Sequence, residues 1–139
     1  MRRDDYLDAI RRLGLPSQDY IVTGSGVLGA LDLREAGDID LVVSQAVYEE
    51  FEAAGTWQRK YYPDGAYGLV SGIYEAGLDW DSETGEPNLH GLKQDETVID
   101  GVPFVSLRRL RAWKQKMGRP KDLTDILLID RYLSLGGRT

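Results

Sequence analysis

Two short stretches decide the fold: residues 20–25, with the sequence YIVTGS, and residues 38–43, with the sequence DIDLVV. Each combines a run of strand-forming apolar residues with small or acidic ones, and the segment between them predicts a brief helix. Because side chains alternate along a strand, Asp38 and Asp40 share one face and have apolar neighbours behind them. Two carboxylates fixed on one strand face form a hard-oxygen site that suits Mg²⁺ or Mn²⁺.

The residues around the two acids favour a site over a merely solvated strand face. Residues 41–43, the sequence LVV, continue the strand and predict burial on both of its faces. Gly24 and Ser25, at the start of the brief helix, offer backbone N–H groups and a hydroxyl to a phosphate. A Gly-Ser pair alone is more often a turn and a helix cap, but its distance from Asp38 favours phosphate binding.

Working outward, periodicity and turn residues predict an α+β fold in a single domain over residues 1–139. The expected helices cover residues 4–13, 45–54, 107–117 and 122–135. The expected strands cover residues 57–62, 67–74 and 78–81, with a hairpin over 98–105 around Asp100-Gly101. We expect the only histidine, His90, to lie in a solvated loop.

Composition excludes several classes of function. The sequence contains no cysteine, so disulfides, thiolate nucleophiles and zinc fingers are excluded. The longest apolar stretch, residues 20–31, is too short to span a bilayer, and no secretion signal is expected at the N-terminus. These features predict a cytoplasmic protein that makes no membrane contact.

The charge distribution suggests a compact polyanionic ligand. The net charge is −6, which argues against general nucleic-acid binding. Residues 101–121 nevertheless contain no acid and form a basic strip. Its cations are Arg108, Arg109, Arg111, Lys114, Lys116, Arg119 and Lys121. An acidic body with one basic strip suits a triphosphate.

Helix geometry singles out Lys114 within that strip. At 100° per residue it lies at the edge of the apolar arc, whereas Arg108, Arg109 and Lys116 point away. A lysine that faces inward needs an anionic partner. That partner is either a bound triphosphate or a structural carboxylate, for which Asp130 is the obvious choice.

The pattern of residues 21–25 followed by DIDLVV resembles the DNA polymerase beta-like nucleotidyltransferases, a superfamily that includes small bacterial minimal and abortive-infection-type members. The tail from Lys114 through residues 119–126, the sequence RPKDLTDI, is also similar to the small members. The resemblance implies a mixed β-sheet flanked by helices, with a C-terminal helical pair. It also implies a third carboxylate on a later strand, for which Asp79 fits and Asp81 is the fallback.

The same resemblance implies transfer of a nucleoside monophosphate from a nucleoside triphosphate to an acceptor hydroxyl, with release of pyrophosphate. Asp38, Asp40 and Asp79 would hold the metal, and Asp79 would help to deprotonate the acceptor. Gly24, Ser25 and Lys114 would bind the phosphates. The acceptor stays open between a small molecule, a protein and a tRNA end. Many minimal members carry a basic residue directly after the serine; this chain does not, and Arg34 is the possible substitute.

Two alternatives remain open. The domain could be a catalytically degenerate nucleotide-binding or antitoxin-like module that acts through a partner protein. The run of residues 24–29, GSGVLG, also matches the dinucleotide-binding pattern G-x-G-x-x-G of Rossmann-type domains. A short helix, and acids at the start of the second strand instead of its end, make the Rossmann alternative the more distant one.

Overall fold

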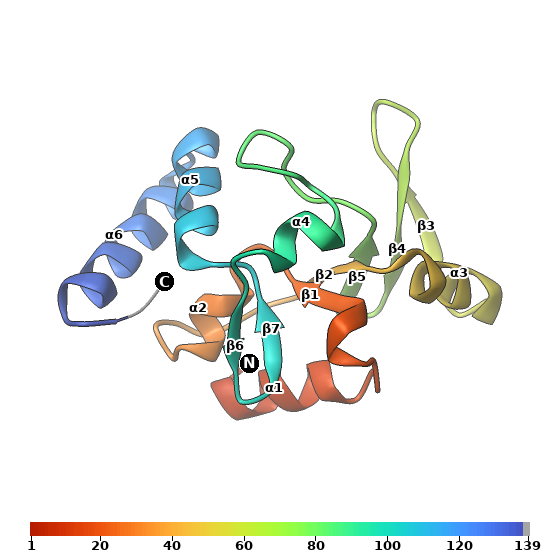
Figure 1. Cartoon of the computed structure of the whole chain (residues 1–139), viewed down its shortest axis with the longest axis horizontal. Helices are drawn as coiled ribbons and strands as arrows, with labels where there is room; N and C mark the ends of the chain where they lie inside the picture. The colour runs from red at the N-terminus through yellow and green to blue at the C-terminus, as the bar shows by residue number, and fades with distance from the viewer. Residues whose placement is uncertain (138–139) are drawn as a thin grey trace.

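A seven-stranded mixed sheet forms the centre of the molecule, with strand order β3-β4-β5-β2-β1-β7-β6 (Figure 1). The structure is a computed structural model and describes residues 1–137. The strands are β1 (Tyr20–Val22), β2 (Ile39–Val43), β3 (Gln58–Tyr61), β4 (Tyr67–Ser71), β5 (Tyr74–Gly77), β6 (Thr97–Ile99) and β7 (Val102–Phe104). The helices are α1 (Arg3–Arg11), α2 (Gly26–Ala30), α3 (Gln45–Ala54), α4 (Leu89–Lys93), α5 (Leu107–Met117) and α6 (Pro120–Ser134). The predicted α+β class is confirmed.

Strand directions exclude the Rossmann alternative. Strands β1 and β2 pair antiparallel, whereas a dinucleotide-binding βαβ unit requires them to be parallel. On its other side β2 pairs parallel with β5, and this register sets Asp40 directly beside Glu75. The centre of the sheet therefore carries two neighbouring acids from strands that are far apart in sequence.

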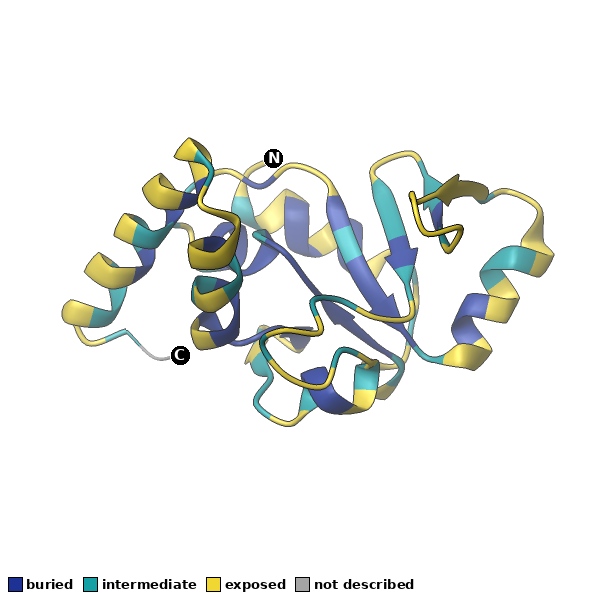
Figure 2. Ribbon diagram, turned by 90° about the horizontal axis from the view of Figure 1, so that it is seen from above, coloured by how far each residue is buried: buried dark blue, intermediate teal, exposed yellow. Residues whose placement is uncertain are grey.

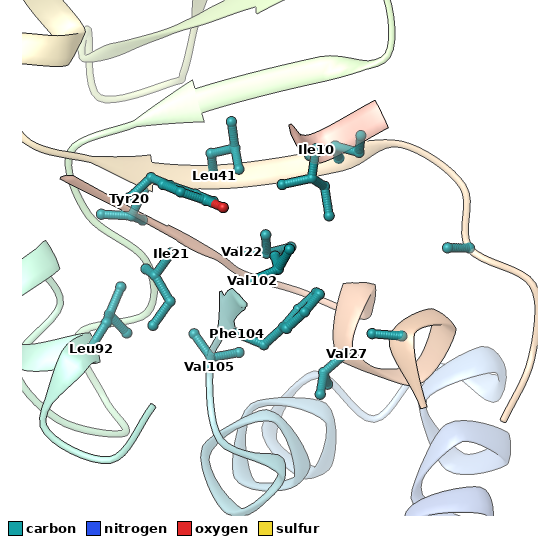
Figure 3. Packing of buried hydrophobic residues seen from close by; sticks show 14 of the residues in the cluster. Ile10, Tyr20, Ile21, Val22, Val27, Leu41, Leu92, Val102, Phe104 and Val105 are labelled. Atoms are coloured by element: carbon teal, nitrogen blue, oxygen red, sulfur yellow. The ribbon is translucent and has the colours of Figure 1, made fainter. Parts of the chain in front are cut away.

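Helices cover both sides of the central strands. In Figure 3, Leu92 of α4 lies by Ile21 on one side of β1, and Ile10 of α1 lies by Leu41 on the other. Successive residues of β1 alternate between these sides, which is why all three of them are buried. Figure 2 shows the result as buried central strands, with exposed residues on the outer faces of the helices.

Glycine and a positive φ break two of the predicted strands. The predicted strand over 67–74 divides into β4 and β5, because Gly72, at φ +58°, turns the chain between them. The predicted strand over 78–81 does not form: only an isolated bridge joins Asp79 to Asn88, and Asp81 has φ +50°. The predicted hairpin over 98–105 is confirmed, with positive φ at both turn residues.

The loop prediction for His90 is wrong, because this residue lies in α4. Asn88 caps that helix by accepting a hydrogen bond from the Gly91 N–H at 2.9 Å. Asn is a good N-cap residue, but a single turn after a Pro-Asn pair gives too few residues for a helical period to be seen.

The C-terminal helices α5 and α6 form the predicted pair and lie side by side (Figure 1). Ser106 caps α5, and Gly118, at φ +62°, ends it. Arg109 does not point away from the core as predicted: it is buried, and its guanidinium donates to the Glu86 carbonyl at 2.8 Å. Within residues 1–137, no helix has the length and apolar character needed to cross a membrane.

Candidate functional site

The start of strand β2 presents two acids as side-chain alternation predicts, with Asp38 directly before the strand and Asp40 within it. Ile39 and Leu41 are buried, whereas Asp38 is exposed and Asp40 is partly exposed. The Thr23 N–H donates to the Asp40 carbonyl at 2.8 Å, which fixes the acids against the end of β1. The structure therefore holds Asp40 on a central strand of the sheet and Asp38 at the point where that strand begins.

Asp38 and Asp40 line one cavity of about 340 Å³ together with Gly24 and Ser25, so four of the predicted site residues meet there. The same cavity is lined by three cationic side chains, from Arg34, Arg119 and Lys121. We call it the charged cavity. Two acids and three bases around one space suit a ligand that carries both a metal ion and several anionic oxygens.

Gly24 is required at the wall of this cavity. Its φ is +63°, and a Cβ atom built on it would lie 3.1 Å from the Asp40 Oδ2 atom. Glycine thus permits both the left-handed turn and the close approach of the carboxylate. Ser25 precedes α2 and its hydroxyl makes no capping hydrogen bond, which leaves that hydroxyl available at the cavity wall.

The three cations of the charged cavity are held in different ways. The Arg34 guanidinium donates to both carboxylate oxygens of Asp125, at 2.8 and 3.0 Å. The Arg119 Nε atom donates to Asp122 at 2.6 Å. Lys121 makes no ion pair with any residue in the 1–137 range, so its ammonium charge is uncompensated. The cavity therefore has two fixed guanidinium groups and one free ammonium group.

Lys114 lies beneath these cations instead of lining the charged cavity. Its side chain is buried, and its Nζ atom lies 2.7 Å from Asp125 and 3.3 Å from Asp122. The ion pairs, chiefly that with Arg119, lower the pKa of Asp122 to about 2. Lys114 thus faces the two carboxylates that hold Arg34 and Arg119, and its predicted contact with phosphate stays a prediction.

The prediction that Asp130 is the carboxylate partner of Lys114 is wrong. Asp130 is exposed and accepts from Arg111 at 2.7 Å on the outer side of the helical pair. The sequence offered three acids on α6, and Asp130 lies five residues after Asp125 and eight after Asp122. The packing of α5 against α6 decides which of these acids the lysine reaches.

A second cavity, of about 210 Å³, meets the charged cavity at Asp40 and Gly24. Trp80, Trp113 and Tyr62 contribute its aromatic wall, and we call it the aromatic cavity. The two tryptophan rings are tilted against each other with their centroids 5.3 Å apart. Trp113 lines both cavities, so an aromatic surface runs from one to the other beside the acids.

Asp79 lines the aromatic cavity, as does Glu75, which was not among the predicted site residues. Glu75 lies opposite Asp40 in the register of β5 and β2, and it pairs with Lys60 at 3.0 Å. The signal for Glu75 was an acid between Tyr74 and an alanine, the same apolar–acid–apolar pattern that pointed to Asp79. Asp79 itself makes no ion pair within residues 1–137.

The fallback prediction of Asp81 as the third carboxylate of the site is wrong. Its backbone leaves the extended conformation, so it does not share a strand face with Asp79. Its carboxylate pairs with Lys116 instead and does not line the aromatic cavity. The alternation rule fails there because the strand has already ended at Gly77.

Asp40 is an acid whose surroundings disfavour its charge. Burial raises the pKa of Asp40 to about 6, with further increases from Glu75 and Asp38 and a smaller opposing effect of Lys60. Ionisation of Asp40 therefore costs free energy in the folded protein. A divalent ion between Asp38 and Asp40 would relieve this penalty.

Within residues 1–137, no group of three Asp, Glu or His side chains is arranged to hold a metal ion. The predicted triad of Asp38, Asp40 and Asp79 is accordingly divided, with Asp38 on the charged cavity and Asp79 on the aromatic one. Mg²⁺ commonly takes one or two protein carboxylates and completes its shell with substrate phosphates and water. Asp38 and Asp40 fit that mode and do not fit an all-protein metal cage.

A larger hollow, of about 750 Å³, lies near the N-terminus and is lined only by charged side chains, among them Arg2, Arg3 and Glu35. Arg3 already pairs there with Asp4 and with Asp100. Because no buried acid or aromatic wall converges on this hollow, we place the candidate site at the two smaller cavities.

Comparison of this chain with protein-family models, curated proteins and solved structures returns no match. The geometry of the two cavities is therefore the basis for assigning a function.

Proposed function

We propose that the chain is a Mg²⁺-dependent nucleotidyltransferase that binds a nucleoside triphosphate in the charged cavity. The observation that carries the proposal is the meeting of Asp38 and Asp40 with three cations in one space. A bare anion would be repelled by the acids, and a bare metal ion by the cations. A metal-bound triphosphate satisfies both sets of charges, which supports this ligand over either alone.

Each part of the site has a defined task in this proposal. Asp38 and Asp40 would hold the Mg²⁺ ion, which when bound neutralises charge on the phosphate oxygens. Lys121, which has no ion pair of its own among the described residues, would bind the phosphates with its ammonium group. Arg34 and Arg119 would also bind them, with guanidinium groups that Asp125 and Asp122 hold in place. The turn at Gly24 and Ser25 would bring the phosphate tail close to the acids.

The acceptor would enter the aromatic cavity on the other side of Asp40. Its hydroxyl oxygen attacks the α-phosphorus, a new O–P bond forms, the α–β phosphoanhydride bond breaks, and pyrophosphate leaves. The hydroxyl proton passes to Asp79, which makes no ion pair in the described part of the chain. Glu75 is less suited to accept that proton, because Lys60 and the Tyr62 hydroxyl already contact it. Most of the rate enhancement would come from positioning and charge.

A transfer assay tests this function. The protein is incubated with Mg²⁺, each nucleoside triphosphate labelled at the α-phosphate, and acceptors drawn from small hydroxyl compounds, tRNA and protein extract. We expect label on one acceptor class with wild type and with the Asp130→Asn control, whose acid lies outside both cavities, and none with Asp40→Asn. Nucleotide binding without any label transfer would contradict the transferase proposal.

A nucleotide-binding module without catalysis is the second candidate. Two observations favour it: no three-acid metal group occurs in residues 1–137, and Lys60 already neutralises Glu75. Such a module would bind the triphosphate in the charged cavity as the enzyme would, and it would also bind a partner protein. It would release no pyrophosphate. Partner binding that survives the Asp40→Asn substitution would favour it.

A further inference from the structure

The Tyr6 hydroxyl is a buried polar group without a partner. The Tyr6 side chain is 0% exposed, and its hydroxyl makes no hydrogen bond within residues 1–137. The tyrosines Tyr48 and Tyr74 are different, because their hydroxyls donate to backbone carbonyls at 2.9 and 2.7 Å. Leaving a buried hydroxyl unpaired is costly, and a ligand atom that accepts a hydrogen bond from it would remove that cost.

Tyr6 lies at the candidate site although it comes from α1, far away in sequence. It lines the charged cavity together with Asp38, Asp40 and Gly26. A Cβ atom on Gly26 would collide with the Tyr6 hydroxyl, so the glycine makes the room that the phenol occupies. The ring is therefore fitted against the turn between β1 and α2, which is the proposed phosphate-binding turn.

The hydroxyl is available as a donor. Burial raises the pKa of Tyr6, as do the charges of Asp40 and Asp38, against an opposing effect of Arg34, so the phenol stays protonated at physiological pH. Neither Asp38 nor Asp40 accepts a hydrogen bond from it in the described structure. The acceptor that the cavity leaves open is an anionic oxygen supplied by a ligand.

We propose that the Tyr6 hydroxyl donates a hydrogen bond to a phosphate oxygen of the nucleoside triphosphate bound in the charged cavity. This inference rests on the proposed function, but it adds a residue from α1 that no motif marks. It makes Tyr6 a binding residue for the phosphate tail, independent of the base or sugar.

The test uses the full chain with Tyr6→Phe and, as the matched control, Tyr48→Phe. Tyr6→Phe removes an unpaired hydroxyl and should leave the thermal unfolding midpoint unchanged or higher. Tyr48→Phe removes a bonded hydroxyl from a residue that lines neither cavity, and it should lower that midpoint without changing ligand affinity. With Mg²⁺ present, the Kd of Tyr6→Phe should rise about tenfold, the loss expected for one hydrogen bond to a charged group.

Two probes locate the contact: the tightest-binding nucleoside triphosphate, and inorganic tripolyphosphate. A similar rise of Kd for both supports a phosphate contact, whereas a rise for the nucleotide alone overturns it. A lower unfolding midpoint in Tyr6→Phe would make the hydroxyl structural and would also overturn the inference. If wild type binds and Tyr6→Phe binds equally well, only this inference fails; if wild type binds neither probe, the proposed function fails as well.

Discussion

At the scale of single residues, Asp40 connects the fold to the proposed chemistry. It lies on both cavities, beside Glu75 and under Gly24, and its pKa is raised to about 6 by burial and by neighbouring acids. The charge of Asp40 therefore lowers the stability of the fold. Acids with such perturbed pKa values occur mainly at functional sites.

This cost predicts the effect of Asp40→Asn on stability. The pKa of Asp40 is higher in the folded protein than in the unfolded chain, so the folded protein binds more protons between about pH 4 and 6. The wild type therefore loses stability as the pH rises through this range. At pH 7.5 the variant should be more stable by roughly 1–3 kcal/mol. The advantage should vanish near pH 4. Urea unfolding at both pH values checks this, and a destabilised variant at pH 7.5 would contradict it.

Gly24→Ala should separate backbone strain from site geometry. The new methyl group lies 3.1 Å from the Asp40 Oδ2 atom at a φ of +63°, so it strains the turn and displaces the carboxylate. Gly14→Ala is the control, since Gly14 has φ +65° and nothing within 4 Å of a built Cβ atom. Both should lose about 1–2 kcal/mol of stability. Only Gly24→Ala should weaken Mg²⁺-dependent nucleotide binding in calorimetry, and equal binding losses would refute the distinction.

Sequence reasoning could find Asp38, Asp40, Gly24 and Ser25 because they belong to two stretches joined by one short helix. Their shared face follows from local alternation, and the structure brings all four to one cavity. Glu75 was not predicted as a site residue, because its position beside Asp40 depends on the pairing of β5 with β2. No local sequence pattern encodes that pairing.

At the scale of elements, the pairing of α5 with α6 depends on a buried charge cluster. Lys114 on α5 meets Asp122 and Asp125 on α6, and the same two acids hold Arg119 and Arg34. Three cations and two acids make the cluster net positive. It joins the helical pair to the loop that follows α2, and so places two guanidinium groups at the charged cavity.

The Lys114→Met substitution should therefore strongly destabilise the protein. It leaves two buried carboxylates short of a partner, and we expect a loss of about 3–5 kcal/mol in the free energy of unfolding. Arg111→Met, on the same helix, breaks only the exposed pair with Asp130 and should cost at most about 1 kcal/mol. Urea unfolding at pH 7.5 compares them. Similar losses would show that burial of the ion pairs is not what joins the two helices.

Elements with strong local signals were predictable and the others were not. The hairpin over 98–105 is confirmed, and Ser44 and Ser106 cap the helices expected after them, because turn and cap residues act locally. The region from 78 to 93 was misread, because its one helix is too short to show a period and its chain is held by contacts with α5. Sheet order, too, is set by contacts distant in sequence.

At the scale of the whole molecule, ion pairing compensates most of the basic strip. Most of its members contact acids, as Arg108 does with Asp95 and Lys116 with Asp81. Lys121 forms no ion pair within residues 1–137, and it lines the charged cavity. An acidic protein thus presents one uncompensated lysine beside its central acids, a distribution that favours a small metal-bound polyanion over a long nucleic acid.

The most direct test of the central claim is a calorimetric titration of wild type with each of the four nucleoside triphosphates at pH 7.5, in Mg²⁺ and in EDTA. The matched variants are Asp38→Ala/Asp40→Ala and the control Asp130→Asn. We predict binding of at least one triphosphate that requires Mg²⁺, disappears in the double variant and persists in the control. Absence of binding to all four triphosphates, or equal binding in EDTA, would contradict a metal-dependent triphosphate site at Asp38 and Asp40.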